Sequence, residues 1–150
     1  MRDLRSLTIL LFNIVIIIQT NKMEIKIKNV NEICIAEIIS DKVEIHNAQD
    51  ALDIFANCMY QGSSKVIINE RNITPKLFDL KTGIAGDVFQ KCSNYKIKLA
   101  IVGDFSKYTS KSLRDFIYES NNHGQINFVS SIEEAKEKLV NNKIYNYESK

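Results

Sequence analysis

The sequence predicts an α/β domain built on a mixed, mostly parallel sheet. Short, continuously apolar runs alternate with helical patterns, and a pattern typical of a β-hairpin precedes them. Of the 150 residues, 45% are hydrophobic and 25% are charged, as in an ordinary globular domain. Apolar strands separated by helices indicate parallel strands joined by right-handed crossovers. We therefore expect two strands followed by the order α-β-α-β-α-β-α.

The first 22 residues are expected to lie outside this domain. Residues 7–18 are nearly all apolar and follow Arg2 and Arg5, as in a secretory signal, but no small-residue cleavage site follows. Three interpretations remain open: a signal or membrane anchor, a disordered extension, or upstream sequence translated ahead of a true start at Met23. The last is favoured because Met23 opens directly onto a strand pattern. We expect one domain over residues 23–140 and a polar tail over residues 141–150.

The first half of the domain begins with the hairpin, over residues 24–39, with its turn at residues 29–32. After it the apolar period changes to three and four, which predicts a helix that Asn47 caps and Gly62 ends. Residues 66–68 then form a short strand. Its continuous apolar character predicts burial on both faces of the sheet.

A second helix is expected to start at Thr74 and Pro75, a capping residue followed by the proline that suits a first helical turn. Its apolar stripe runs as far as Phe89. Gly83 and Gly86 interrupt this stripe and lower the helix propensity. We therefore expect these two glycines to allow close packing against the sheet.

The second half of the domain repeats the same alternation. Residues 97–102 form the longest strand, and its composition predicts a central position. Ser110 is expected to cap the third helix, and Gly124 to end it. After a last strand at residues 126–129, the capping-box pattern of residues 131–134 predicts a fourth helix.

Charge and cysteine usage exclude several functional classes. The net charge of +2 comes from the first 22 residues, and the rest has 17 basic and 17 acidic side chains, so no nucleic-acid partner is expected. Cys34, Cys58 and Cys92 lie in apolar runs without a Cys-x-x-Cys pair, which predicts buried thiols in the cytoplasm. Membrane attachment or export is expected only if residues 1–22 are retained. With two isolated histidines, neither a metal nor another cofactor is predicted.

Polar residues follow the predicted parallel strands, where ligands bind in open α/β sheets. The ligand-binding candidates after two of these strands are Glu70, Arg71, Asp104, Ser106 and Ser110. Asp and Ser also satisfy the backbone of ordinary turns, and Glu-Arg pairs are common at exposed strand ends. Both interpretations stay open for these residues.

Catalytic residues cannot be assigned from the sequence, which matches neither nucleotide-binding loops nor hydrolase motifs. We expect a non-catalytic protein. The alternative is a small-molecule-binding protein or enzyme that uses the corner around Glu70, Asp104 and Ser106, and this alternative requires the three side chains to converge on one pocket.

Three segments resemble a known family. They are DLKTGIAG at residues 79–86, KLAIVGDFS at residues 98–106 and SKSLRDFIYESN at residues 110–121. Together they look like the bacterial domain-of-unknown-function family 4180, over roughly residues 23–139. This resemblance implies no established activity, but it supports Met23 as the beginning of the domain.

The element order is also similar to the STAS fold of anti-sigma-factor antagonists. Those proteins carry an Asp-Ser-Ser-Gly-Leu motif, and a partner kinase phosphorylates its second serine. The nearest match here, residues 79–84, has one extra residue and Thr82 in place of that serine. The resemblance implies a regulatory or interaction module, a regulatory protein partner and Thr82 as a phosphorylation candidate. If the second helix starts at Pro75, however, Thr82 lies two turns inside it and is expected to be a packing residue.

Overall fold

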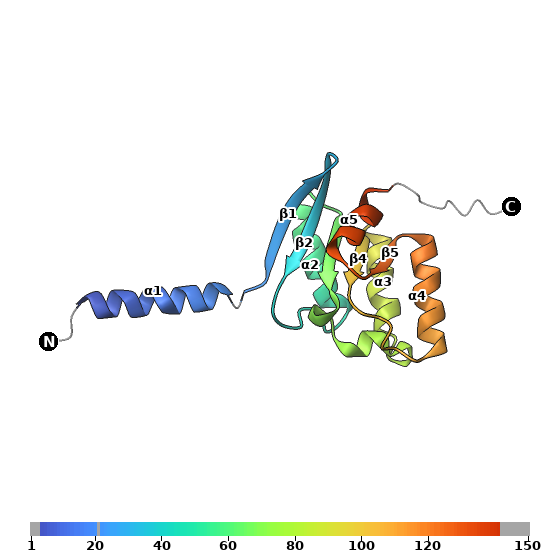
Figure 1. Cartoon of the computed structure of the whole chain (residues 1–150), viewed down its shortest axis with the longest axis horizontal. Coiled ribbons are helices and arrows are strands. Elements are labelled where there is room, and N and C mark those ends of the chain that lie inside the picture. Colours follow the sequence, from blue (N-terminus) through green and yellow to red (C-terminus); the bar gives the residue numbers. More distant parts are fainter. Residues whose placement is uncertain (1–3, 21, 142–150) are drawn as a thin grey trace.

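A five-stranded sheet forms the centre of the computed structural model, which describes residues 4–20 and 22–141 (Figure 1). Strand β1 (Glu24–Val30) pairs antiparallel with β2 (Ile33–Ile39). Strands β3 (Lys65–Asn69), β4 (Lys98–Val102) and β5 (Ile126–Val129) then follow in parallel, in the order β1-β2-β3-β4-β5. The predicted mixed, mostly parallel sheet with an N-terminal hairpin is confirmed.

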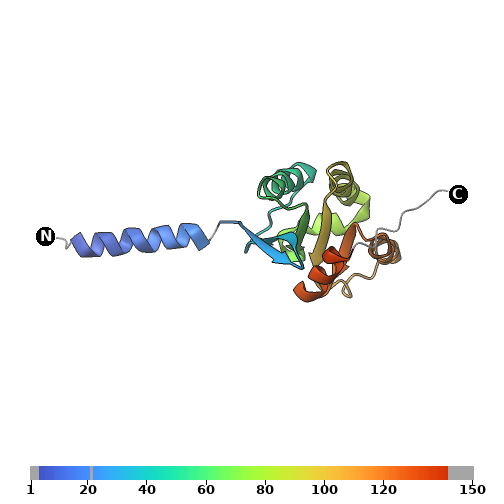
Figure 2. The same ribbon diagram turned by 90° about the horizontal axis from the view of Figure 1, so that it is seen from above.

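Helices cover both faces of this sheet (Figure 2). Helices α2 (Ala48–Tyr60) and α3 (Ile84–Asn94) pack on one face, α5 (Ile132–Val140) packs on the other, and α4 (Lys111–His123) lies along β5. The larger core lies under α2 and α3. Its largest fully buried side chains are those of Ile38, Ile45, Phe55, Val66, Ile68, Leu77, Ile97, Leu99 and Ile101.

Capping side chains start three of these helices as predicted. The Asn47 side chain accepts a hydrogen bond from the N–H of the third residue after it, and Ser110 and Ser131 do the same, at 2.9, 3.3 and 3.1 Å. Gly124 ends α4 with φ at 85°, in the left-handed region that glycine adopts without strain. These local signals are confirmed. Each could be predicted because the bond that it requires joins residues only a few positions apart in the sequence.

The predicted second helix is wrong over its first half. Thr74 and Pro75 begin a short 3-10 turn, η2 (Pro75–Phe78), and a second turn, η3 (Leu80–Thr82), follows before α3 starts at Ile84. Gly83 between them has φ at 75°, which no residue of a right-handed helix adopts. The capping signal was therefore correct, but the chain leaves the helical path first at Asp79, whose backbone is extended (φ −96°, ψ 101°), and again at Gly83.

The expected role of the two glycines in this segment is also wrong. A Cβ atom at Gly83 or Gly86 would meet nothing within 4 Å, so neither packs closely against the sheet. Gly83 is required by its backbone conformation. Gly86 lies exposed in the first turn of α3 and leaves the backbone there open.

The hairpin turn is shorter than predicted. Val30 pairs with Ile33, so Asn31 and Glu32 alone form the turn, with φ of 50° and 66°. Two successive positive φ values match the right-handed twist of paired strands. Residues 29 and 30, which were predicted in the turn, therefore belong to β1.

Helix α1 (Leu4–Thr20) extends away from the sheet (Figure 1). Its exposed large apolar side chains are those of Leu4, Leu7, Ile9, Leu10, Leu11, Phe12, Ile14 and Val15. Within the described part of the chain, no helix combines the length and the apolar character needed to cross a membrane. The three interpretations of this segment stay predictions. The polar tail from residue 142 onward lies outside the described residues.

Candidate functional site

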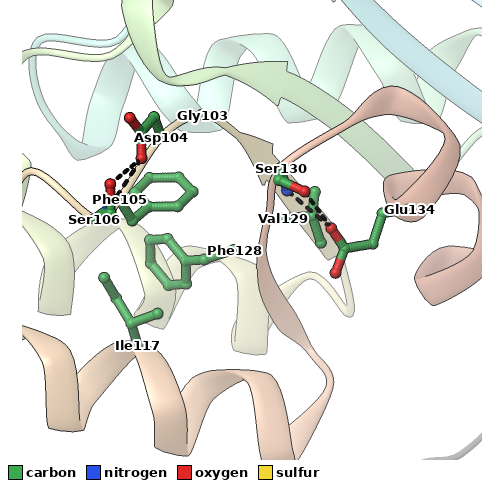
Figure 3. A pocket seen from close by; sticks show the side chains of 9 residues that line it. All are labelled: Gly103, Asp104, Phe105, Ser106, Ile117, Phe128, Val129, Ser130 and Glu134. Atoms are coloured by element: carbon green, nitrogen blue, oxygen red, sulfur yellow. Dashed lines mark hydrogen bonds between the residues drawn. The ribbon is translucent and has the colours of Figure 1, made fainter.

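A groove of about 490 Å³ lies beyond the C-terminal ends of β4 and β5, where open parallel sheets bind ligands (Figure 3). Residues from the β4–α4 loop, α4, β5 and the start of α5 line it. They are Gly103, Asp104, Phe105, Ser106, Ile117, Phe128, Val129, Ser130 and Glu134. Carboxylates and hydroxyls therefore surround an aromatic and aliphatic floor.

One side of the groove is the turn from Asp104 to Ser106. Asp104 Oδ1 accepts hydrogen bonds from the Ser106 hydroxyl at 2.5 Å and from the Ser106 N–H at 3.1 Å. These two bonds, followed by the nearby charge of Lys107, hold the pKa of Asp104 below its usual range. Asp104 is therefore ionised near neutral pH, and both side chains are exposed.

The opposite side of the groove is the start of α5. Glu134 Oε2 accepts hydrogen bonds from the N–H and the hydroxyl of Ser130, at 2.9 and 3.0 Å. In the usual capping box this carboxylate bonds to the N–H of the capping residue, here Ser131. Here it bonds one residue earlier and so fixes the chain that leaves β5.

The floor of the groove is held in place by ring packing and by α4. The rings of Phe105 and Phe128 meet edge to face, with centroids 5.2 Å apart. Asn121 of α4 pairs with the backbone of Phe128 in both directions: its Oδ1 accepts from the Phe128 N–H at 2.7 Å, and its Nδ2 donates to the Phe128 carbonyl at 3.2 Å. This side chain also occupies part of the open edge of β5, which would otherwise be free to pair.

Glu70 forms a second polar cluster next to Gly103, outside the groove lining. Its Oε1 accepts a hydrogen bond from the Tyr108 hydroxyl at 2.5 Å and pairs with Lys107 Nζ at 2.7 Å. Burial, the bond to Glu70 and the charge of Glu70 all raise the pKa of Tyr108. A Cβ atom at Gly103 would lie 2.8 Å from Glu70 Cβ, so only glycine lets the β4–α4 loop pass this close.

The five predicted ligand-binding residues are thus divided. Asp104 and Ser106 lie together on the groove. Glu70 faces Lys107 and Tyr108, Arg71 is exposed on the short turn η1 (Glu70–Asn72), and Ser110 caps α4. The convergence of Glu70, Asp104 and Ser106 on one pocket, which the small-molecule alternative requires, is not seen.

Sequence reasoning missed Glu134, Lys107 and Tyr108. Glu134 was expected only as part of the capping-box pattern of residues 131–134. The capping-box pattern was the signal from which a role for Glu134 at the end of the last strand could have been predicted. The contact between Tyr108 and Glu70 spans 38 positions, and nothing in the local sequence points to it.

Thr82 lies exposed at the end of η3, immediately before the start of α3. Its hydroxyl shares one hydrogen between the carbonyls of Lys76 and Asp79, at 2.7 and 2.8 Å, and accepts from the Ile84 N–H at 3.3 Å. Because α3 starts at Ile84 and not at Pro75, Thr82 does not lie inside an α-helix. The packing role that followed from the earlier start is therefore wrong.

The described residues contain no group of three or more His, Cys, Asp or Glu side chains that could hold a metal ion. The three thiols are free. Cys58 and Cys92 are buried, as predicted, and burial raises their pKa values to about 11 and about 12. Cys34 is only half-buried, so the expectation of burial is wrong for this residue.

Comparisons with known proteins agree with the family that the sequence motifs resemble. The family model described as "Domain of unknown function (DUF4180)" matches residues 30–139. A crystal structure of a "putative anti-sigma factor antagonist" from Thermotoga maritima is similar at a TM-score of 0.41 and 14% identity, over 77% of this chain and 93% of that chain. No functionally curated protein matches the chain.

Proposed function

The chain belongs to the family described as "Domain of unknown function (DUF4180)", and we propose that it is a non-catalytic regulatory module that binds a partner protein and is switched by phosphorylation of Thr82. The observation that carries this proposal is the position of the Thr82 hydroxyl. It is exposed, it precedes the first turn of α3, and it connects three consecutive elements.

In the unmodified chain, the Thr82 hydroxyl stabilises the path of residues 75–84. Its bonds to the carbonyls of Lys76 and Asp79 hold η2 and η3 together, and its bond to the Ile84 N–H joins them to α3. A phosphate ester at this oxygen has no hydrogen to donate near neutral pH. Phosphorylation therefore removes both bonds to the carbonyls and loosens the two turns.

The start of α3 offers the same phosphate free N–H groups, beside one negative charge of Asp87 in the first turn. The first N–H groups of a helix have no intrahelical partner, and the helix dipole stabilises negative charge there. Gly86 carries no side chain that would cover this turn, and Lys81 lies next to Thr82 in the sequence. Modification thus exchanges one set of local contacts for another and adds nearly two negative charges to the surface.

Two further observations support a module that works by binding. At the sheet edge, one oxygen of Asp104 bonds to Ser106, and one oxygen of Glu70 bonds to Tyr108 and Lys107, so each carboxylate is held by a neighbouring side chain. The free thiols of Cys34, Cys58 and Cys92 fit the reducing cytoplasm as the proposed place of action.

The proposal is tested by incubating the full chain with ATP and a lysate of its own organism, followed by mapping of phosphorylated residues by mass spectrometry. We expect phosphate at position 82 in the original chain and in Thr82→Ser, and none at this position in Thr82→Val. A partner recovered with the chain is then purified and its binding constant measured with and without the phosphate. Phosphate on other residues but never on Thr82 contradicts the proposal.

A further inference from the structure

The side chains on both sides of the groove between Asp104 and Glu134 favour a positively charged ligand. Each carboxylate uses one oxygen on a neighbouring serine, Asp104 on Ser106 and Glu134 on Ser130. Among the described residues, the hydrogen bonds of these carboxylates involve Asp104 Oδ1 and Glu134 Oε2 alone. No Lys, Arg or His lines the groove, and the nearest positive charge that acts on Asp104 is that of Lys107, outside the lining. An occupant with a positive charge would therefore be favoured on both sides.

The floor of the same groove favours an apolar group. Figure 3 shows the rings of Phe105 and Phe128 between the two carboxylate sides, with Ile117 of α4 below them. Aromatic faces also attract a cation that lies over them. The occupant is thus expected to combine a cationic nitrogen with an adjacent apolar side chain.

The openness of the site indicates a protein segment rather than a free metabolite. Small-molecule sites bury most of the ligand surface. Here Asp104, Ser106 and Ser130 are all exposed, so the site covers an occupant on one side only. Such an open site suits a protein segment, which can insert one or two side chains into the groove while its backbone stays outside.

From this arrangement we infer that the groove binds a basic segment of a partner protein, which inserts an Arg or Lys side chain next to an aliphatic one. The inference adds to the proposed function the chemistry of the partner protein. It rests on one part of the proposed function, which is that the chain binds a protein partner. It does not depend on phosphorylation of Thr82, which lies outside the residues that line the groove.

The test uses the full chain labelled with ¹⁵N and titrated with a capped peptide of alternating leucine and arginine. Saturable shifts of the amides of residues 103–106 and 128–134 are expected. A peptide with glutamate in place of arginine serves as the charge control, and hexylamine serves as the small free cation. Asp104→Asn and Glu134→Gln keep the oxygen that bonds to serine and remove only the charge. Each substitution is expected to weaken arginine-peptide binding about fivefold, and both together about tenfold or more.

Asp87→Asn and Glu119→Gln are the matched controls, since both residues are exposed and lie outside the groove lining. These variants should bind the arginine peptide as the original chain does. Equal binding of the glutamate peptide, equal losses in the control variants, or binding of hexylamine without the peptide would each overturn the inference. Because no phosphate is present in this titration, its failure is distinct from failure of the Thr82 switch.

Discussion

Asn72 is the buried polar residue on which the connection between β2 and α2 depends. It is fully buried, and its Nδ2 donates to the carbonyls of Ser40 and Lys42, each at 2.8 Å. Its backbone carbonyl accepts from the N–H groups of Glu44 and Ile45, at 2.8 and 3.0 Å, whereas its side-chain Oδ1 has no hydrogen-bond partner among the described residues. One asparagine thus satisfies four backbone groups of a segment that has no regular structure of its own.

Replacement of Asn72 by alanine is expected to lower the free energy of unfolding by about 2 kcal/mol, because two carbonyls lose their donor inside the protein. Urea denaturation measures the change. Asn57→Ala is the control, since Asn57 is exposed and its side chain bonds to Gln61 on the surface of α2, and it should change stability by less than about 0.5 kcal/mol. Equal effects of the two substitutions would contradict the role given to Asn72.

At the scale of elements, the hairpin turn holds a glutamate in a conformation that suits glycine. Glu32 has φ at 66°, and a side chain in the left-handed region costs free energy that glycine avoids. Glu32→Gly is therefore expected to raise the free energy of unfolding by about 0.5–1 kcal/mol. Thermal and urea denaturation measure this gain.

Glu32→Ala separates backbone strain from the loss of the glutamate charge. Alanine has the same difficulty with positive φ as glutamate, so this variant should bring no comparable gain. If alanine stabilised the chain as much as glycine does, the strain assigned to this turn would be wrong.

Helix starts could be predicted where a short side chain alone decides them. Asn47, Ser110 and Ser131 each cap the helix that follows, and these bonds involve residues three apart. Thr74 and Pro75 gave an equally clear signal, but it serves a 3-10 turn as well as an α-helix. The start of α3 depends on Gly83 at φ 75°. Because glycine adopts positive and negative φ about equally well, its presence in the sequence does not predict this conformation.

At the scale of the whole molecule, the mostly parallel sheet could be predicted from the alternation of strands and helices, whereas the order of its strands and the site could not. The strand at residues 97–102 was expected to be the longest and central, but β4 lies fourth of the five strands and is shorter than β1 and β2. The groove joins the β4–α4 loop to the start of α5, and the Glu70 cluster joins η1 to Tyr108. Asp104 and Ser106 could be predicted from the sequence, because both lie in the loop that follows a strand. Glu134, Lys107 and Tyr108 gain their roles only through packing, which no local pattern encodes.

The buried thiols make the stability of the folded chain depend on pH. Burial raises the pKa of Cys92 from 9.0 to about 12, so the folded state retains this proton when the unfolded state loses it. The stabilisation is complete below pH 9 and decreases as the pH rises through the pKa of the folded chain. Between about pH 9 and pH 10.5, the contribution lost is about 2 kcal/mol.

Cys92→Ala should remove this part of the pH dependence, as measured by urea denaturation at a series of pH values. Ile97→Val is the control, because it shortens a fully buried side chain without changing a titrating group. Other groups, including Lys65 and Lys98, titrate equally in all three proteins, so their contributions cancel in the comparison. Parallel curves for the original chain and Cys92→Ala would contradict the assignment.

The central claim, that Thr82 is a switch, is tested most directly by amide hydrogen exchange in chains with and without phosphothreonine incorporated at position 82. The N–H groups of Asp79 and Thr82 bond to the carbonyls of Lys76 and Asp79, to which the Thr82 hydroxyl also bonds, so they should exchange faster when the phosphate removes the hydroxyl's bonds. The amides of β3 and β4 should be unchanged and serve as the internal control. Identical exchange over residues 75–86 in the two chains would contradict the switch.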